Sequence, residues 1–228
     1  MPLQPIENTI GTNDACQIPV IISTRSPERP SRGRCSSNLK EIPVSYNRAY
    51  LPIVLCTNTR SARYKLSDLS VSANYNQADI VCAVETWFDN SMDDSCFALG
   101  TNFSAVIRHD RQNRIGGGVA AWFHHNLTFK HWQHLESSEF ESLWFTVWSC
   151  KMPRKFSRII LGIIYHPPSN AEGHRNLCNH IINCVDHIKR HHPYSGVMLV
   201  GDFNQFPDRL LVPHLKVKQI IKAPTRGA

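Results

Sequence analysis

Five polar residues stand where predicted strands end. Each of the apolar segments 52–57, 79–84, 158–164 and 197–200 is followed within two residues by an amide, a carboxylate or a phenol. The residues concerned are Asn58, Glu85, Tyr165, Asp202 and, two residues later, Asn204. Loops at the ends of buried strands are where ligand-binding groups gather. A single such residue is ordinary capping or turn chemistry, but their repetition predicts a site assembled from distant segments.

These side chains suit metal-assisted hydrolysis of a phosphodiester. A hard cation such as Mg²⁺ (or Mn²⁺) prefers oxygen ligands, usually one or two carboxylates together with waters and phosphate oxygens. Glu85 is the candidate metal ligand, and Asn58 completes the shell. Tyr165 and Asn204 are neutral groups that can hold phosphate oxygens. Asp202 can orient or deprotonate the attacking water.

Alternating apolar and amphipathic stretches must position these groups. Runs of aromatic and β-branched residues predict strands over 52–57, 79–84, 103–108, 119–123, 140–149, 158–165 and 197–200. Helical spacing of apolar residues predicts helices over 60–74 and 171–191. Many strands with few helices favour an α/β fold in which two sheets pack face to face with the helices outside.

The composition changes near residue 50. Residues 1–50 hold 6 of the 14 prolines and none of the tryptophans or phenylalanines. The stretch 25–34 is too polar to bury the apolar surface that would offset the entropy of ordering it. We therefore expect a flexible basic leader over residues 1–50 and one folded domain over residues 51–228.

The net positive charge of the chain favours a negatively charged partner. The chain has 25 Lys and Arg against 18 Asp and Glu, a net charge of +7, which suits an anionic partner such as DNA. No apolar run approaches the roughly 20 residues that span a bilayer, and the first residues lack the pattern of a secretory signal. We expect an intracellular protein with no membrane partner, nuclear if it acts on genomic DNA, whose 8 cysteines are mostly buried free thiols.

Five short motifs follow one another in an order that resembles a known superfamily. They are Thr57-Asn58-Thr59-Arg60-Ser61, Ala83-Val84-Glu85-Thr86-Trp87, Arg108-His109-Asp110-Arg111 leading to Gly116-Gly117-Gly118, Ile164-Tyr165-His166-Pro167-Pro168-Ser169, and Gly201-Asp202-Phe203-Asn204. Together they resemble the endonuclease/exonuclease/phosphatase (DNase I-like) superfamily. They are most similar to the endonuclease domain at the start of non-long-terminal-repeat retrotransposon polyproteins, which also carry a reverse transcriptase.

The resemblance implies a four-layer α/β sandwich, two packed mixed sheets with outer helices, that nicks DNA with a divalent metal. It implies that Glu85 binds the metal and that Asn58 is its neighbour at the metal and phosphate. Tyr165 would contact the scissile phosphate, Asp202 would align or activate the water, and Asn204 would hydrogen-bond the phosphate.

Three further residues are candidate contacts of nucleic acid. Thr225 loosely corresponds to a threonine of the superfamily that lies near the DNA backbone. Arg108 and Arg111 could meet DNA phosphates, although solvated loop charges explain them equally well. The glycines at 116–118 fit no phosphate-binding loop, and we expect them to form a tight turn between strands.

The sequence departs from the superfamily at its C-terminal end. The last strands of the superfamily carry a Ser-Asp-His element whose histidine engages the phosphate, and no such element follows Asn204. We therefore expect the last strands to be missing, the sheet edge beside the Asp202 strand to be open, and nicking to be impaired. Two alternatives remain: an inactive remnant that binds nucleic acid non-specifically, and a relative that acts on other phosphate esters.

Overall fold

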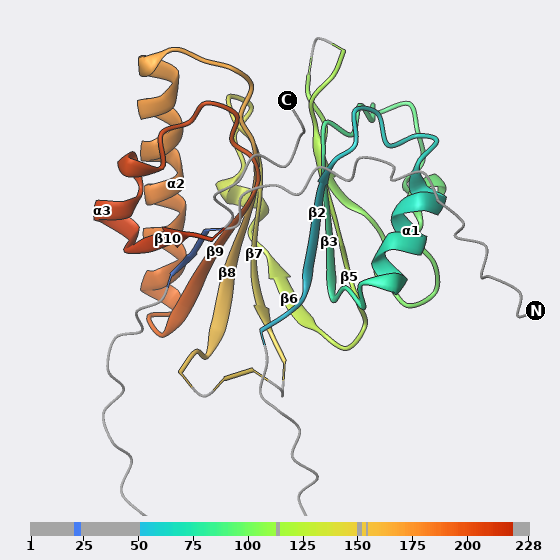
Figure 1. Cartoon of the computed structure of the whole chain (residues 1–228), viewed down its shortest axis with the longest axis horizontal. Helices are drawn as coiled ribbons and strands as arrows, with labels where there is room; N and C mark the ends of the chain where they lie inside the picture. The colour runs from blue at the N-terminus through green and yellow to red at the C-terminus, as the bar shows by residue number, and fades with distance from the viewer. Residues whose placement is uncertain (1–20, 24–50, 113–114, 150–151, 154, 221–228) are drawn as a thin grey trace, which may run out of the picture.

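Two mixed β-sheets form the centre of the molecule (Figure 1). The computed structural model describes residues 21–23, 51–112, 115–149, 152–153 and 155–220. The smaller sheet has the order β2-β3-β5-β4, with β2 (Val54–Asn58) parallel to β3 (Ile80–Val84) and antiparallel pairing elsewhere. Its other strands are β4 (Ile107–His109) and β5 (Val119–Phe123).

The larger sheet has the order β10-β1-β9-β8-β7-β6. Its one parallel pair joins β8 (Arg158–Tyr165) to β9 (Ser195–Asp202), in a register that sets Tyr165 opposite Asp202. The remaining strands are β1 (Ile21–Ser23), β6 (Thr128–His131), β7 (Glu141–Trp148) and β10 (Val217–Gln219).

Helices cover the outer face of each sheet (Figure 1). They are α1 (Leu66–Tyr75) on the smaller sheet, and α2 (Ala171–His191) and the short α3 (Val212–Leu215) on the larger one. Short 3-10 turns are formed by Asp94–Phe97, Gln133–Leu135 and Asp208–Leu210. Three apolar clusters fill the spaces between the layers. One lies between α1 and the smaller sheet, one between the two sheets, and one between the larger sheet and the helices α2 and α3. The predicted four-layer α/β sandwich is confirmed.

Helix α2 has the predicted bounds, and its sequence explains them. The Asn170 side chain caps its first turn by accepting a hydrogen bond from the Gly173 N–H at 2.9 Å. The basic residues at 189–191 in the last turn suit the negative end of the helix dipole. The predicted apolar stripe is buried against the larger sheet, through Leu177, Ile181, Val185 and Ile188.

Strand alternation decides which side chains reach the layer between the sheets. On β8 the odd-numbered residues from Ile159 to Tyr165 enter this layer, while Ile160 and Ile164 face α2. Cys56 on β2 and Val200 on β9 lie in the same layer. Because alternate side chains of a strand share a face, the last residues of β2 and β9, two positions further on, are directed inward as well.

The sheet edge beside the Asp202 strand is not open, so this expectation is wrong. Strand β1 pairs antiparallel with β9, with Ile21 opposite Leu199 and Ile22 opposite Met198, and β10 pairs with the other side of β1. Long-range pairing thus forms a strand that local composition did not predict. β1 comes from the segment 1–50 in which we expected a flexible leader, and the other residues of that segment lie outside the described part.

Other features follow the sequence with smaller differences. The helix expected from residue 60 begins at Leu66, because Arg60 and Ser61 have left-handed backbone angles of φ 41° and 76°. Within the described residues, Cys56, Cys82, Cys96, Cys178 and Cys184 are free thiols, and all but Cys96 are buried. No helix in the described ranges is long and apolar enough to cross a membrane.

Candidate active site

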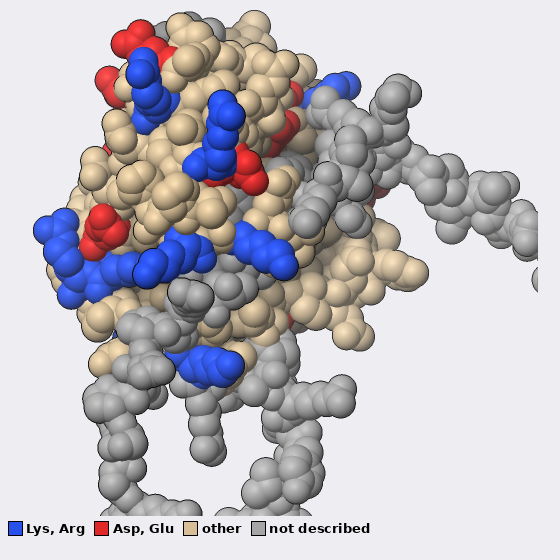
Figure 2. All heavy atoms as spheres, turned by 60° about the vertical axis from the view of Figure 1, so that its left-hand side comes forward, with Lys and Arg blue, Asp and Glu red and all other residues tan. Residues whose placement is uncertain are grey.

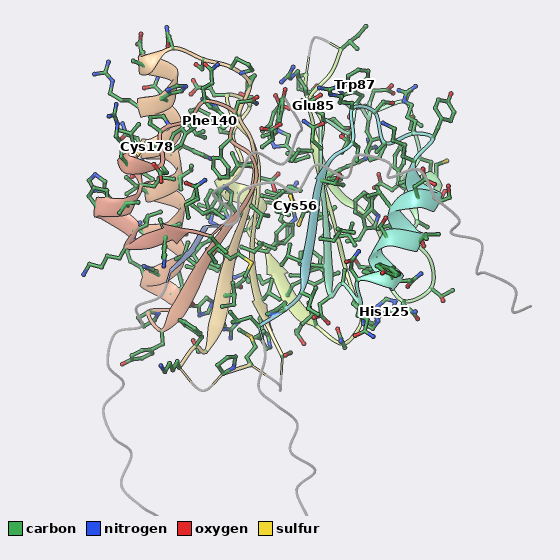
Figure 3. All side chains as sticks on the ribbon, in the orientation of Figure 1. Cys56, Glu85, Trp87, His125, Phe140 and Cys178 are labelled. Carbon is green, nitrogen blue, oxygen red and sulfur yellow. The ribbon has the colours of Figure 1, made fainter. Side chains whose placement is uncertain are left out.

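The C-terminal ends of β2, β3, β8 and β9 meet at one end of the inter-sheet layer. Figure 3 shows Glu85 above Cys56, at this end of the smaller sheet. The residues predicted from the ends of the strands come together here from both sheets: Asn58 and Glu85 from the smaller sheet, and Tyr165, Asp202 and Asn204 from the larger one.

The Asn58 amide joins the two sheets. Its Nδ2 donates hydrogen bonds to Glu85 Oε1 at 2.7 Å and to Asp202 Oδ2 at 2.8 Å. Asn58 is 7% exposed, so little water competes for these bonds. Two carboxylates from opposite sheets therefore share one neutral amide, and their oxygens converge on a small volume.

The Asp202 carboxylate is fixed by its own loop. Its Oδ1 accepts a hydrogen bond from the Asn204 N–H at 3.0 Å, and the backbone of Asn204 is left-handed at φ 46°. The Asn204 Nδ2 donates to the His166 carbonyl at 2.7 Å, while the His166 N–H donates to the Asp202 carbonyl at 2.8 Å. The turn thus ties the end of β9 to the end of β8.

Glu85 reaches the site through an unusual backbone conformation. Val84 faces the inter-sheet layer, so alternation alone would direct the next side chain toward α1. The left-handed angle of Glu85, φ 52°, breaks the alternation and brings its carboxylate to Asn58. The Ser61 N–H and the Ala62 N–H donate to the carbonyls of Glu85 and Thr86, each at 2.9 Å, and hold this loop in place.

Left-handed residues are concentrated around this end of the sheets. Arg60, Ser61, Glu85, Trp87 and Asn204 all have φ between 41° and 76°. For residues other than glycine such angles are uncommon and cost about 1–3 kcal/mol each. Strain gathered in this way is typical of functional sites.

Tyr165 keeps its proton at neutral pH. Burial raises the pKa of the phenol to about 12, and the negative charge of Glu85 adds to the rise, against the opposing charge of Arg111. Tyr165 can therefore serve as a hydrogen-bond donor but not as a base.

His166, the histidine next to Tyr165, stays neutral. Its ring is buried beside His174 and Phe206, with ring centroids 5.2 and 5.9 Å away. Burial, with a smaller effect of His174, lowers the pKa of His166 to about 4. His166 contributes to the site through its backbone. Its N–H donates a hydrogen bond to the Asp202 carbonyl, and its carbonyl accepts one from the Asn204 amide.

An ion pair that sequence reasoning did not predict borders the site. Arg111 Nε donates to Glu141 Oε1 at 2.6 Å, and the Gly118 N–H donates to the same carboxylate. The Arg111 guanidinium lies 5.4 Å from the centre of the Tyr165 ring. Glu141 was missed because it opens β7 and its partner is 30 residues away in the sequence. Its one signal was a carboxylate at the start of a long apolar strand.

The remaining candidates have different environments. Arg108 lies outside the cluster, where it pairs with Asp94 at 2.7 Å and with Asp110 and donates to the carbonyls of Asp89 and Met92. Thr225 lies outside the described residues. The glycines at 116–118 all have φ between 72° and 91°, as expected of a tight turn.

A basic face lies on the larger sheet's helices. Figure 2 shows Lys and Arg side chains in a band across the face that carries α2 and α3. Burial lowers the pKa of Lys189 in α2, and the positive charge of Lys216, which follows α3, lowers it further against the opposing charge of Asp186. Arg190 in the last turn of α2 and Arg209 in the turn before α3 add two further positive charges on these elements.

The donor set suits a hard divalent cation. Among the described residues, no three His, Cys, Asp or Glu side chains converge on a metal-binding site. The cluster instead offers the oxygens of two carboxylates, while the Asn58 amide faces them with its nitrogen and its Oδ1 accepts a hydrogen bond from the Arg60 N–H at 3.1 Å. One or two carboxylates are the small protein share that Mg²⁺ takes when waters and phosphate oxygens supply the rest. Glu85 and Asp202 face the same amide without a cation from the described residues between them. The residues present therefore fit such an ion.

The structure is similar to several solved nucleases and phosphatases. The endonuclease domain of TRAS1, a telomere-specific non-LTR retrotransposon, is 16% identical over 72% of this chain and 73% of that one, with a TM-score of 0.46. The human Nocturnin catalytic domain is 17% identical over 72% and 68%, with a TM-score of 0.48. The Neisseria 3′ phosphatase NExo, bound to a product DNA hairpin, is 13% identical over 68% and 58%, with a TM-score of 0.46.

Comparisons of the sequence give no match. No model of a protein family and no curated protein matches this chain.

Proposed function

We propose that the domain over residues 51–228 is a divalent-metal-dependent phosphodiesterase of retrotransposon origin that nicks DNA. The observation that carries this proposal is the Asn58 amide held between Glu85 and Asp202. An arrangement of two carboxylates, an amide and a protonated phenol at one end of two sheets has the parts that phosphodiester hydrolysis needs. A protein that nicks genomic DNA would act in the nucleus.

Each group has a role that follows from its environment. Glu85 would hold Mg²⁺ or Mn²⁺, with Asn58 as its neighbour at the metal and phosphate, and the ion when bound would polarise the phosphate and stabilise the charge on the leaving oxygen. Tyr165, protonated at neutral pH, would donate a hydrogen bond to a phosphate oxygen. The Asn204 amide would hold a second oxygen.

Asp202 is the residue suited to handle the water. Its carboxylate is oriented from one side by the Asn204 N–H and from the other by Asn58, so it can accept a proton from a water placed against the phosphate. The buried, neutral ring of His166 does not take this part.

A nicking assay on supercoiled plasmid tests the proposal. The chain should convert the plasmid to the open-circular form with Mg²⁺ and not with EDTA, at the slow rate that the expected impairment implies. Asp202→Asn removes the proton acceptor and should slow nicking by about 10²-fold or more. The matched control is Asp208→Asn, which makes the same change at an exposed carboxylate of the next turn and should nick at the rate of the parent. Equal rates for the two variants would refute the role of Asp202.

The same assay separates the proposal from its nearest alternative. A chain that binds DNA but does not nick it with either metal is an inactive remnant. A chain that hydrolyses small phosphate esters and leaves plasmid intact acts on another class of substrate.

The basic face makes DNA binding depend on salt. Positive side chains that neutralise phosphates release condensed counterions, so affinity falls as salt concentration rises. We expect the affinity for duplex DNA to fall at least about tenfold between 50 and 200 mM salt, with little dependence on sequence. Fluorescence anisotropy of a labelled duplex measures this. An affinity unchanged over that range would contradict an electrostatic footprint.

A further inference from the structure

A cavity of about 770 Å³ opens beside the candidate active site. Its walls come from the loops that follow β2, β3 and β4. The first of these loops begins directly after Asn58, and the second begins with Glu85. Trp87 lies only two residues beyond Glu85, and Figure 3 shows both at the same end of the smaller sheet. The cavity therefore lies next to the loop that carries Glu85.

Large apolar side chains are exposed at the cavity. Tyr64 and Ile115 are each 92% exposed and Trp87 is 39% exposed, and all three line it. Single exposed apolar side chains are ordinary, but three that line one cavity make it a candidate binding site. The flat faces of the two aromatic rings suit a flat, partly apolar ligand.

Charges at the cavity are balanced within the protein. Asp89 pairs with Arg63, Asp110 pairs with Arg108, and Arg111 pairs with Glu141. Burial raises the pKa of Asp110, against the opposing charge of Arg108. Because the charged groups have internal partners, the cavity is poorly suited to a phosphate or another strongly charged ligand.

Neutral amide groups complete the lining. Asn90 and Gln112 border the cavity, and side-chain amides both donate and accept hydrogen bonds. Such groups can pair with the edge of a nucleobase while aromatic rings stack on its face.

Backbone hydrogen bonds fix the position of Trp87 relative to Glu85. The Trp87 N–H donates to the Gly117 carbonyl at 3.0 Å, and the Ser61 N–H donates to the Glu85 carbonyl at 2.9 Å. A Cβ on Gly116 would lie 3.6 Å from the Trp87 indole nitrogen, so the indole packs close to the backbone of that turn. The backbone thus sets how far Trp87 lies from Glu85.

We propose that this cavity binds an unpaired nucleobase of the DNA strand being cut, stacked on Trp87 and Tyr64. The assignment rests on the proposed function, because it takes the scissile phosphate to lie at the cluster of Glu85, Tyr165 and Asp202. A base turned out of the stack enters a pocket of this kind and is read by stacking and edge hydrogen bonds. The site therefore favours DNA that is single-stranded or easily unpaired where it is cut.

Binding without metal tests the assignment separately from catalysis. The probes are a labelled oligo(dT) and an oligomer of equal length in which every nucleotide is an abasic tetrahydrofuran analogue, both measured in EDTA. The two carry the same phosphates, so their difference reports the bases. The parent should bind oligo(dT) about tenfold more tightly than the abasic oligomer, as expected for one base stacked on aromatic side chains.

Single substitutions should remove that preference. Tyr64→Ala and Trp87→Ala should each reduce the ratio of the two affinities several-fold while the affinity for the abasic oligomer stays unchanged. Tyr75→Ala is the matched control, because Tyr75 is 87% exposed but does not line the cavity. If Trp87→Ala fails to fold, Tyr64→Ala carries the test, since its ring is almost entirely in solvent.

Three outcomes would overturn the assignment. They are a parent that binds both oligomers equally, a Tyr64 variant that keeps the full preference, and a Tyr75 variant that loses it as well. Thymidine monophosphate should compete far more weakly than oligo(dT), and equal competition would point to a free nucleotide as the ligand. If the chain prefers oligo(dT) to the abasic oligomer but does not nick plasmid, the proposed function is refuted while the cavity still binds a nucleobase.

Discussion

Glu85→Gln should lower the affinity for Mg²⁺ by at least about 100-fold, because it removes the negative charge that attracts the cation while keeping the shape of the side chain. Outer partners of metal ligands already contribute about 10–100-fold, and a carboxylate in direct contact contributes more. Since a bound metal supplies several kcal/mol of transition-state stabilisation, nicking at a fixed Mg²⁺ concentration should fall on the order of 10³-fold.

Calorimetric titration with Mg²⁺ measures the affinity, and the plasmid assay measures the rate. Glu139→Gln is the control, because it makes the same chemical change at an exposed position. Raising the Mg²⁺ concentration should restore part of the activity of Glu85→Gln and should leave Asp202→Asn slow. A Glu85 variant that binds Mg²⁺ as tightly as the parent would show that the cation is held elsewhere.

Gly201→Ala should destabilise the fold by at least about 3 kcal/mol. Gly201 has φ 133°, and a Cβ there would lie 1.8 Å from the Ile164 carbonyl oxygen in the adjoining strand β8. The added methyl group must therefore push β9 away from β8 one residue before Asp202. The loss should appear in urea unfolding as a lower midpoint with an unchanged slope.

Gly100→Ala separates the two causes of this loss. Gly100 also has a positive φ, 114°, but a Cβ there would meet nothing nearer than Ser70 Oγ at 4.0 Å. It should cost only the conformational strain, about 1 kcal/mol. If both variants lose the same stability, the close approach of β8 and β9 is not what requires glycine at 201.

The positions of Asn58, Tyr165 and Asp202 could be predicted because they obey local rules. Each ends an apolar strand whose alternation continues onto it, so sequence alone indicates both the strand end and the face. The chemistry followed from side-chain types. The two-sheet sandwich followed from many strands with only two long helices.

Other features depend on contacts that local sequence does not encode. Glu85 lies in the cluster because of a backbone reversal that a non-glycine residue makes only under the constraint of neighbouring loops. The pair of Arg111 and Glu141 joins a loop to a strand far along the chain. Strand β1 forms because its backbone pairs with β9 on one side and β10 on the other. The composition of the sequence around β1 favours irregular structure instead.

The hydrogen bond between Asn58 and Asp202 spans 144 residues of sequence, with consequences for how the protein is made. A ribosome adds about 5–20 residues per second, so roughly ten seconds or more separate the emergence of these two partners. During that interval the nascent chain carries the smaller sheet's half of the centre and lacks the other half. Translation arrested before β9 would leave Asn58 and Glu85 without Asp202. The two halves of the cluster can therefore meet only after β9 has been synthesised and the two sheets have closed on each other.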